Sequence, residues 1–147
     1  MLYQKIQLDE TDENVFLECF VADKTENYVR DAMLVIPGGG YGGICSNREG
    51  EPIAQAFMPY GFNAFVLHYS VGEKAKFPRP LIEASKAVKH IKDNSEKYNI
   101  DPNRVFAVGF SAGGHLTAAL GALWHIQEIY DAGPMEYGSN KPAGGIP

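Results

Sequence analysis

One serine stands in the sequence context that nucleophilic catalysis requires. Residues 109–113 read Gly-Phe-Ser-Ala-Gly and match the pattern G-x-S-x-G, between an apolar run and a segment of helical character. The flanking residues must be small, because strand and helix pass closely at a sharp turn. Near the start of a helix, the hydroxyl of Ser111 would lie beside free N–H groups that favour developing negative charge. We interpret Ser111 as a nucleophile; the alternative is a glycine-rich turn whose serine only caps the helix.

A second glycine-rich segment has the composition of an oxyanion-binding loop. Residues 37–41 read Pro-Gly-Gly-Gly-Tyr and follow the apolar run at residues 32–36. Glycines let backbone N–H groups turn outward, and the N–H of Ala112, directly after the nucleophile, would be the partner donor. One such donor is typically worth about 3–4 kcal/mol of transition-state stabilisation. The alternative, a phosphate-binding loop, lacks both the G-x-G-x-x-G pattern with its acidic residue and a following Gly-Lys-Ser/Thr.

The segments around these motifs alternate between strand and helix patterns. The expected strands are residues 2–8, 15–21, 32–36, 63–68 and 104–108, and the expected helices are residues 51–60, 81–91 and 112–126. The first two strands alternate in polarity and suit an antiparallel pair, whereas the later apolar runs suit strands buried on both faces. Repeated strand–helix–strand units predict an α/β fold with a doubly wound, mostly parallel sheet.

The expected helix after Pro80 has the clearest periodicity in the chain. Its apolar residues recur at helical spacing, and they are Leu81, Ala84, Val88 and Ile91. Its charged residues are expected on the other faces, and they are Glu83, Lys86, Lys89 and Lys92. This pattern predicts a helix that packs one face on the sheet.

Composition limits the class of protein. The chain has 147 residues, 45% of them apolar and 21% charged, which suits one globular domain. A formal charge of −5 with scattered basic residues argues against a nucleic-acid partner. The first residues show no signal-peptide core, and no apolar run reaches the length of a membrane span. We therefore expect a cytoplasmic protein without a membrane partner.

The two cysteines, Cys19 and Cys45, do not form a disulfide framework, and no spacing suggests a metal site. Cys45 lies in the glycine-rich region, where it is either a reactive thiol or an incidental residue without an activating base. The sequence implies no metal and no organic cofactor.

Four segments together resemble the acetyl-esterase and lipase-like branch of the α/β-hydrolases, which is related to the hormone-sensitive-lipase group and to acetylxylan esterases. The segments are IPGGGYGGICSNREGEPIAQAF, FVLHYSVG, FPRPLIEASKAVKHIKDN and NIDPNRVFAVGFSAGGHLTAALG. They follow the order and spacing of that branch over residues 30–125, and GFSAGGH is the most specific part. The glycine motif of the family often begins with histidine, and here Pro37 takes that place, as in the acetylxylan-esterase-like branch.

The resemblance assigns roles to individual residues. It implies that Ser111 is the nucleophile and that the oxyanion donors are the N–H groups of Gly39, Gly40 and Ala112. The residues expected beside the substrate are Tyr41, His68 and Phe110.

A catalytic base and acid are not visible in the chain. The family places them after the serine, in the order acid and then histidine. His125 is the last histidine, and it precedes the acids Glu128, Asp131 and Glu136. His115 lies on the helix that leads away from the serine. His68 ends a strand at the carboxyl edge of the sheet, where it is either a functional group of the site or a residue that hydrogen-bonds to a loop.

We therefore expect a single α/β-hydrolase domain over residues 1–147, incomplete at its C-terminus after the nucleophile helix, with residues 131–147 as loop. Three explanations stay open: a fragment of an esterase, a chain completed by a second chain, or a folded relative without activity.

Two functions follow from these observations. The first is a serine esterase for small acyl esters, including acetylated carbohydrates, in which a histidine and an acid from outside this sequence handle the proton. The second is a non-catalytic hydrolase-like module that binds a ligand or a partner chain. An incomplete sheet would expose an edge strand and favour homo-oligomers.

Overall fold

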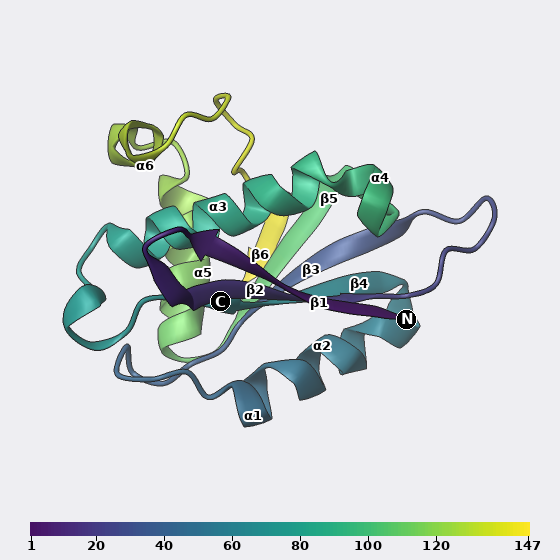
Figure 1. Cartoon of the computed structure of the whole chain (residues 1–147), viewed down its shortest axis with the longest axis horizontal. Coiled ribbons are helices and arrows are strands. Elements are labelled where there is room, and N and C mark those ends of the chain that lie inside the picture. Colours follow the sequence, from purple (N-terminus) through teal and green to yellow (C-terminus); the bar gives the residue numbers. More distant parts are fainter.

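A twisted six-stranded sheet forms the centre of the molecule, and helices cover both of its faces (Figure 1). The computed structural model describes all 147 residues. Its strands are β1 (Leu2–Asp9), β2 (Asp12–Val21), β3 (Arg30–Ile36), β4 (Phe62–His68), β5 (Ile100–Gly109) and β6 (Gly144–Ile146). They lie side by side in the order β1-β2-β4-β3-β5-β6.

The strand directions agree with the fold expected from the sequence. β1 and β2 form an antiparallel hairpin, and β2 runs antiparallel to β4. β4, β3, β5 and β6 are parallel to one another. Because each crossover between parallel strands carries a helix, the result is the doubly wound sheet with antiparallel N-terminal strands that the sequence predicts.

The helices divide the core into two layers. They are α1 (Ser46–Glu49), α2 (Glu51–Phe57), α3 (Arg79–Asp93), α4 (Ser95–Tyr98), α5 (Ala112–Leu123) and α6 (Gln127–Ala132), with short 3₁₀ turns at Met58–Tyr60 and Gly72–Lys74. α2 packs on one face of the sheet, whereas α3 and α5 pack on the other (Figure 1). The larger cluster of buried apolar side chains lies on the α3 and α5 side. No helix is both long and apolar enough to span a membrane.

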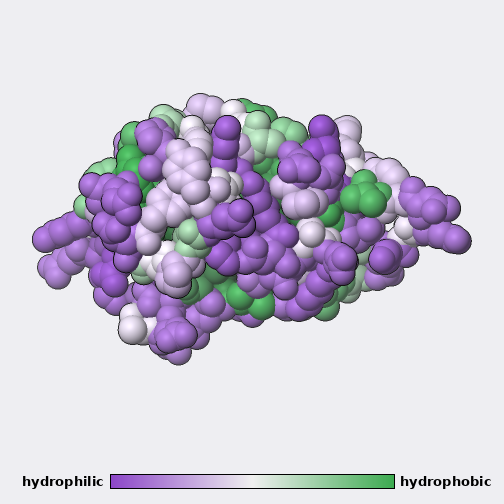
Figure 2. Space-filling model, turned by 90° about the horizontal axis from the view of Figure 1, so that it is seen from above, coloured by the Kyte–Doolittle hydropathy of each residue, from purple (hydrophilic) through white to green (hydrophobic).

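The outer surface above the sheet is mainly polar. Figure 2 shows this face with predominantly hydrophilic side chains and smaller, separate apolar areas between them. The amphipathic α3 explains this arrangement in part: Leu81, Val88 and Ile91 are fully or almost fully buried, and Lys86, Lys89 and Asp93 lie on its more exposed side.

The expectation of a loop over residues 131–147 holds for residues 133–143 and is wrong at both ends of the segment. α6 reaches Ala132, and residues 144–146 pair with Phe106–Val108 as strand β6. The amide of Ala143 also donates to the carbonyl of Val105, 2.7 Å away. Sequence periodicity did not reveal β6, because a short strand with two glycines is held by backbone pairing with an edge supplied by another segment.

The helix expected over 112–126 is also divided. α5 ends at Leu123, and Ile126 is extended before α6 begins at Gln127.

Candidate active site

Ser111 occupies a strained turn between strand and helix. β5 ends at Gly109, α5 begins at Ala112, and Ser111 has φ 53° and ψ −117° with an exposed side chain. A non-glycine residue in such a conformation carries about 1–3 kcal/mol of strain and persists only where its surroundings impose it. At Gly113, an added Cβ would overlap the carbonyl oxygen of Ile36. The turn therefore requires the small flanking residues that the motif supplies.

The glycine loop turns two amides outward. The carbonyl of Gly38 accepts the N–H of Cys45 at 2.9 Å, and the carbonyl of Gly39 accepts the N–H of Gly42 at 3.0 Å. In a trans peptide the C=O and the following N–H point in opposite directions. The N–H groups of Gly39 and Gly40 therefore point away from the loop interior, and neither donates a hydrogen bond within the chain. Gly39 and Gly40 adopt φ 141° and 63°, which favour glycine.

The loop and the serine turn are in direct contact. A Cβ added to Gly38 would lie 2.6 Å from the carbonyl oxygen of Phe110 and 3.1 Å from Cβ of Ser111. The carbonyl of Ser111 accepts the N–H of His115 at 2.9 Å, so the N–H of Ala112 in the same peptide unit points away from the helix. Because β3 and β5 are parallel neighbours, these amides and Ser111 gather at the same edge of the sheet.

A small apolar cavity lies beside this edge. Its volume is about 120 Å³, and its lining residues are Tyr41, Ala75, Phe77, Pro80, Leu81, His115, Leu116 and Ala119. The hydroxyl oxygen of Tyr41 lies 2.8 Å from Nδ1 of His115 at the wall of the cavity. His115 stands one helical turn after Ser111, so one wall of the cavity follows the serine on the same helix, although Ser111 itself does not line it.

His68 and Phe110 lie apart from this cavity. Nε2 of His68 is 2.6 Å from Oε1 of Glu18, and its ring stacks on Phe16 with 4.0 Å between centroids. His68 ends β4, two strands from β5 in the sheet, and burial lowers its pKa. Phe110 packs against the apolar cluster on the α2 side. Of the three expected neighbours of the substrate, the structure brings only Tyr41 to the cavity.

No histidine side chain is hydrogen-bonded to the side chain of Ser111. His68 contacts Glu18, His90 contacts the hydroxyl of Tyr98, and His115 contacts Tyr41. His125 follows the far end of α5, where its ring lies against Trp124. The site thus contains a nucleophile candidate and amide donors without an adjacent proton acceptor.

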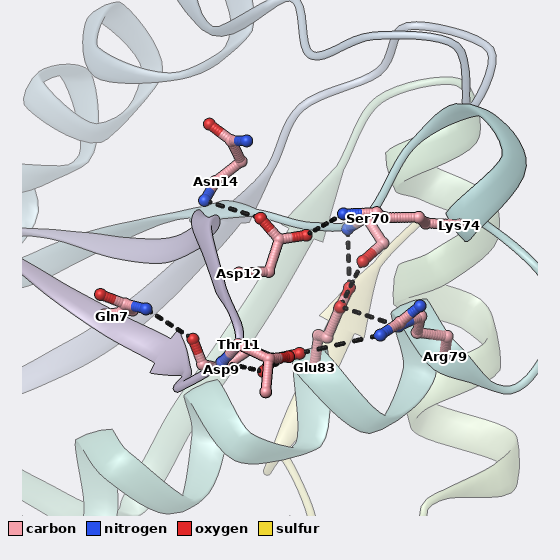
Figure 3. A network of polar contacts seen from close by, with 9 residues as sticks. All are labelled: Gln7, Asp9, Thr11, Asp12, Asn14, Ser70, Lys74, Arg79 and Glu83. Atoms are coloured by element: carbon pink, nitrogen blue, oxygen red, sulfur yellow. Dashed lines mark hydrogen bonds and ion pairs between the residues drawn. The ribbon is translucent and has the colours of Figure 1, made fainter.

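Glu83 departs from its expected place on a polar face of the helix. Its side chain is only 2% exposed and accepts both the N–H of Ser70, at 2.6 Å, and the Ser70 hydroxyl. Figure 3 shows Glu83 reaching from α3 toward Ser70, with Arg79 nearby. Burial raises the pKa of Glu83. No pattern in the sequence distinguished Glu83 from the more exposed charged residues of the same helix, Lys86 and Lys89.

Known proteins resemble this chain in both sequence and fold, and one family model matches most of it. The BD-FAE family model matches residues 17–142. The chain is 44% identical over 122 residues to endo-1,4-beta-xylanase B of Butyrivibrio fibrisolvens and covers 19% of that protein. It is 30% identical over 107 residues to the acetylxylan esterase of Xylanibacter ruminicola and covers 21% of it. These matches span 80% and 71% of the chain itself.

Two solved structures are similar at the level of both sequence and fold. MGS-M1, an α/β-hydrolase enzyme from a Medee basin deep-sea metagenome library, shares 44% identity with a TM-score of 0.81. An acetyl ester-xyloside bifunctional hydrolase from Caldicellulosiruptor lactoaceticus shares 34% identity with a TM-score of 0.72. The alignments cover 86% and 80% of this chain and 53% and 46% of those chains. The chain therefore spans about half of these structures and about a fifth of the curated relatives.

Proposed function

The chain belongs to the BD-FAE family of α/β-hydrolases, and on this basis we propose that it carries the nucleophile and the oxyanion donors of a serine esterase. The observation that carries the proposal is the strained Ser111, held at the sheet edge where the free amides of the glycine loop gather. Relatives named as esterases support carboxylic ester hydrolysis as the reaction class.

In the proposed reaction, the hydroxyl oxygen of Ser111 attacks the carbonyl carbon of the ester. The carbonyl oxygen becomes an oxyanion that accepts hydrogen bonds from the N–H groups of Gly39, Gly40 and Ala112. Collapse of this intermediate expels the alcohol, which takes the proton that the serine gave up, and water then releases the acid. Each donor that is oriented in advance contributes about 3–4 kcal/mol to the stability of the transition state.

The proton transfers require a base, and we assign them to a histidine and an acid outside residues 1–147. This part of the proposal is supported by the partners of the four imidazole rings, none of which is hydrogen-bonded to the side chain of Ser111. An oxyanion hole without its base leaves only residual catalysis, so the chain alone should be a very slow esterase.

The cavity beside Ser111 supports a small acyl group as the substrate. Its volume of about 120 Å³ is below the roughly 150 Å³ of a cavity that holds benzene, and most of its lining is apolar. Acetylated carbohydrates are the proposed physiological esters, because two relatives are named for acetylxylan and for an acetyl ester-xyloside.

The second candidate function is a non-catalytic module that binds a ligand or another chain. It is supported by the serine without a base and by β6, whose outer edge has no neighbouring strand. An unpaired edge offers backbone donors and acceptors to a second copy of the chain.

Incubation with a fluorophosphonate probe and with p-nitrophenyl acetate separates the two functions. The esterase predicts slow labelling and turnover that disappear in Ser111→Ala. Absence of both from the native chain would exclude activity of this chain and favour the binding module, for which light scattering would report self-association.

A further inference from the structure

We infer that Glu49 and Tyr69 are positioning residues that clamp the Pro37–Gly38 peptide and so orient the oxyanion amides of Gly39 and Gly40. The inference rests on the proposed function, since it assigns these two residues a role through amides that would bind the oxyanion.

One peptide plane is held from both of its edges. The N–H of Gly38 donates to Oε1 of Glu49 at 2.9 Å, and the carbonyl of Pro37 accepts the hydroxyl of Tyr69 at 2.6 Å. The two atoms belong to the same planar unit and point in opposite directions. Two side chains from different segments therefore prevent this plane from rotating, and the next plane along the chain carries the N–H of Gly39.

The Glu49 side of the clamp is built into the loop itself. Glu49 ends α1, and its own N–H donates to the carbonyl of Cys45 at 2.9 Å. The N–H of Cys45 in turn donates to the carbonyl of Gly38 at 2.9 Å. Both polar backbone atoms of Gly38 are thus bound by the segment from Cys45 to Glu49, so that segment fixes where the Gly39 amide points.

The Tyr69 side of the clamp comes from the segment between β4 and α3. Tyr69 is 2% exposed, and burial raises the pKa of its hydroxyl, which therefore stays a proton donor. The next residue, Ser70, is fastened to the buried Glu83 (Figure 3). Two residues further, the N–H of Gly72 donates to the carbonyl of Tyr41 at 2.6 Å. This segment therefore hydrogen-bonds to Pro37, just before the three glycines, and to Tyr41, just after them.

The three glycines need such a clamp. Glycine has the widest choice of backbone conformations, and Gly38–Gly40 follow one another without side chains to restrict them. Oxyanion donors are effective only when they are already oriented as charge develops. Glu49 and Tyr69 supply the orientation that the glycines lack.

The test compares three variants with the native chain: Glu49→Ala, Glu49→Gln and Tyr69→Phe. Glu51→Ala, on the exposed side of α2, is the control. The first readout is the set of ¹⁵N order parameters of Gly38, Gly39 and Gly40, which does not depend on activity. We expect these to fall in Glu49→Ala and Tyr69→Phe, and to be retained in Glu49→Gln, which keeps an acceptor oxygen, and in Glu51→Ala.

The second readout is the rate at which a fluorophosphonate labels Ser111. We expect a loss of about tenfold to hundredfold in Glu49→Ala and Tyr69→Phe, less than removal of a donor outright, and near-native rates in Glu49→Gln and Glu51→Ala. Unchanged order parameters in both Glu49→Ala and Tyr69→Phe would overturn the clamp. A slow Glu49→Gln with an ordered loop would also overturn it, because the carboxylate would then act by its charge or as a base.

If the native chain is not labelled, the proposed activity of this chain fails while the order parameters still decide the clamp. Circular dichroism of each variant verifies that the sheet is intact. If Glu49→Ala does not fold, Tyr69→Phe, which loses a single hydroxyl group, still tests the clamp.

Discussion

The hydroxyl oxygen of Tyr41 lies 2.8 Å from Nδ1 of His115, and this contact joins segments 74 residues apart. Tyr41 directly follows Gly40, and His115 lies one turn beyond Ser111. The contact ties the loop that carries the amide donors to the helix that carries the nucleophile. Both side chains also line the apolar cavity, so the same contact fixes the position of the cavity relative to the loop and the helix.

Because residues of α5 line the cavity, we expect this helix to limit the length of the acyl chain that the site accepts. Ala119→Leu should fill the cavity and slow the reaction of Ser111 with a long-chain alkyl fluorophosphonate more than with a short-chain one. Each methylene that a pocket rejects is worth about 1–3 kcal/mol, so the preference should shift by about tenfold or more. Ala118→Leu, exposed on the same helix, is the control. Equal slowing of both probes would mean that the cavity does not receive the acyl group.

The strain at Ser111 is measurable as stability. Ser111→Gly removes the Cβ from a residue at φ 53° and should relieve part of about 1–3 kcal/mol, whereas Ser111→Ala keeps the strain. Glycine loses about 0.4–1 kcal/mol through the unfolded chain, so Ser111→Gly should be about 1 kcal/mol more stable than Ser111→Ala. Urea unfolding of the two variants gives the difference. A more stable alanine variant would contradict the strained geometry.

Two glycines of α5 should respond in opposite ways to alanine. In Gly113→Ala the new Cβ would overlap the carbonyl oxygen of Ile36, so we expect a loss of about 1–3 kcal/mol or more. Gly121 has open space at its Cβ, and Gly121→Ala should raise the free energy of unfolding by up to about 1 kcal/mol. Thermal unfolding with matched buffers compares them. A gain of stability in Gly113→Ala would refute the close approach of β3 and α5.

Burial of Glu83 predicts a pH dependence of stability. Its pKa is raised above the ordinary 4.5, mainly by burial and against the hydrogen bonds from Ser70. As the pH rises from about that ordinary value through the raised one, the unfolded chain ionises first. The contribution of Glu83 to the free energy of unfolding is therefore fully present below the ordinary pKa and is lost as the pH rises through the raised pKa. In Glu83→Gln, the unfolding free energy should lack this decline. Parallel pH profiles for the two proteins would show that Glu83 does not titrate there.

Asn140 should hold the segment that leads into β6. It is fully buried, its Nδ2 donates to the carbonyl of Trp124 at 2.8 Å, and its Oδ1 accepts the hydroxyl of Tyr130 at 2.6 Å. Asn140→Ala leaves buried partners unpaired and should reduce stability by about 1–3 kcal/mol, with faster hydrogen exchange in β6. Asn103→Ala, at an exposed position, should be close to neutral. Unchanged exchange in β6 would show that its pairing with β5 is sufficient.

Features that depend on neighbours along the chain were predictable from the sequence. The motif around Ser111 predicted a turn between strand and helix, because close passage there admits only small residues. The apolar runs predicted β3, β4 and the buried part of β5, because strands covered on both faces are apolar throughout. The order of these elements was sufficient to predict the doubly wound sheet.

Contacts between distant segments could not be predicted in this way and became apparent only in the folded chain. Residues 144–146 became a strand because β5 offered them an edge, and Glu83 became buried because Ser70 supplied its hydrogen bonds. His68 contacts Glu18 on the neighbouring strand β2, and Glu49 accepts a hydrogen bond from the amide of Gly38. A polar side chain takes the partner that folding brings within about 3 Å, and periodicity along one segment carries no information about that partner.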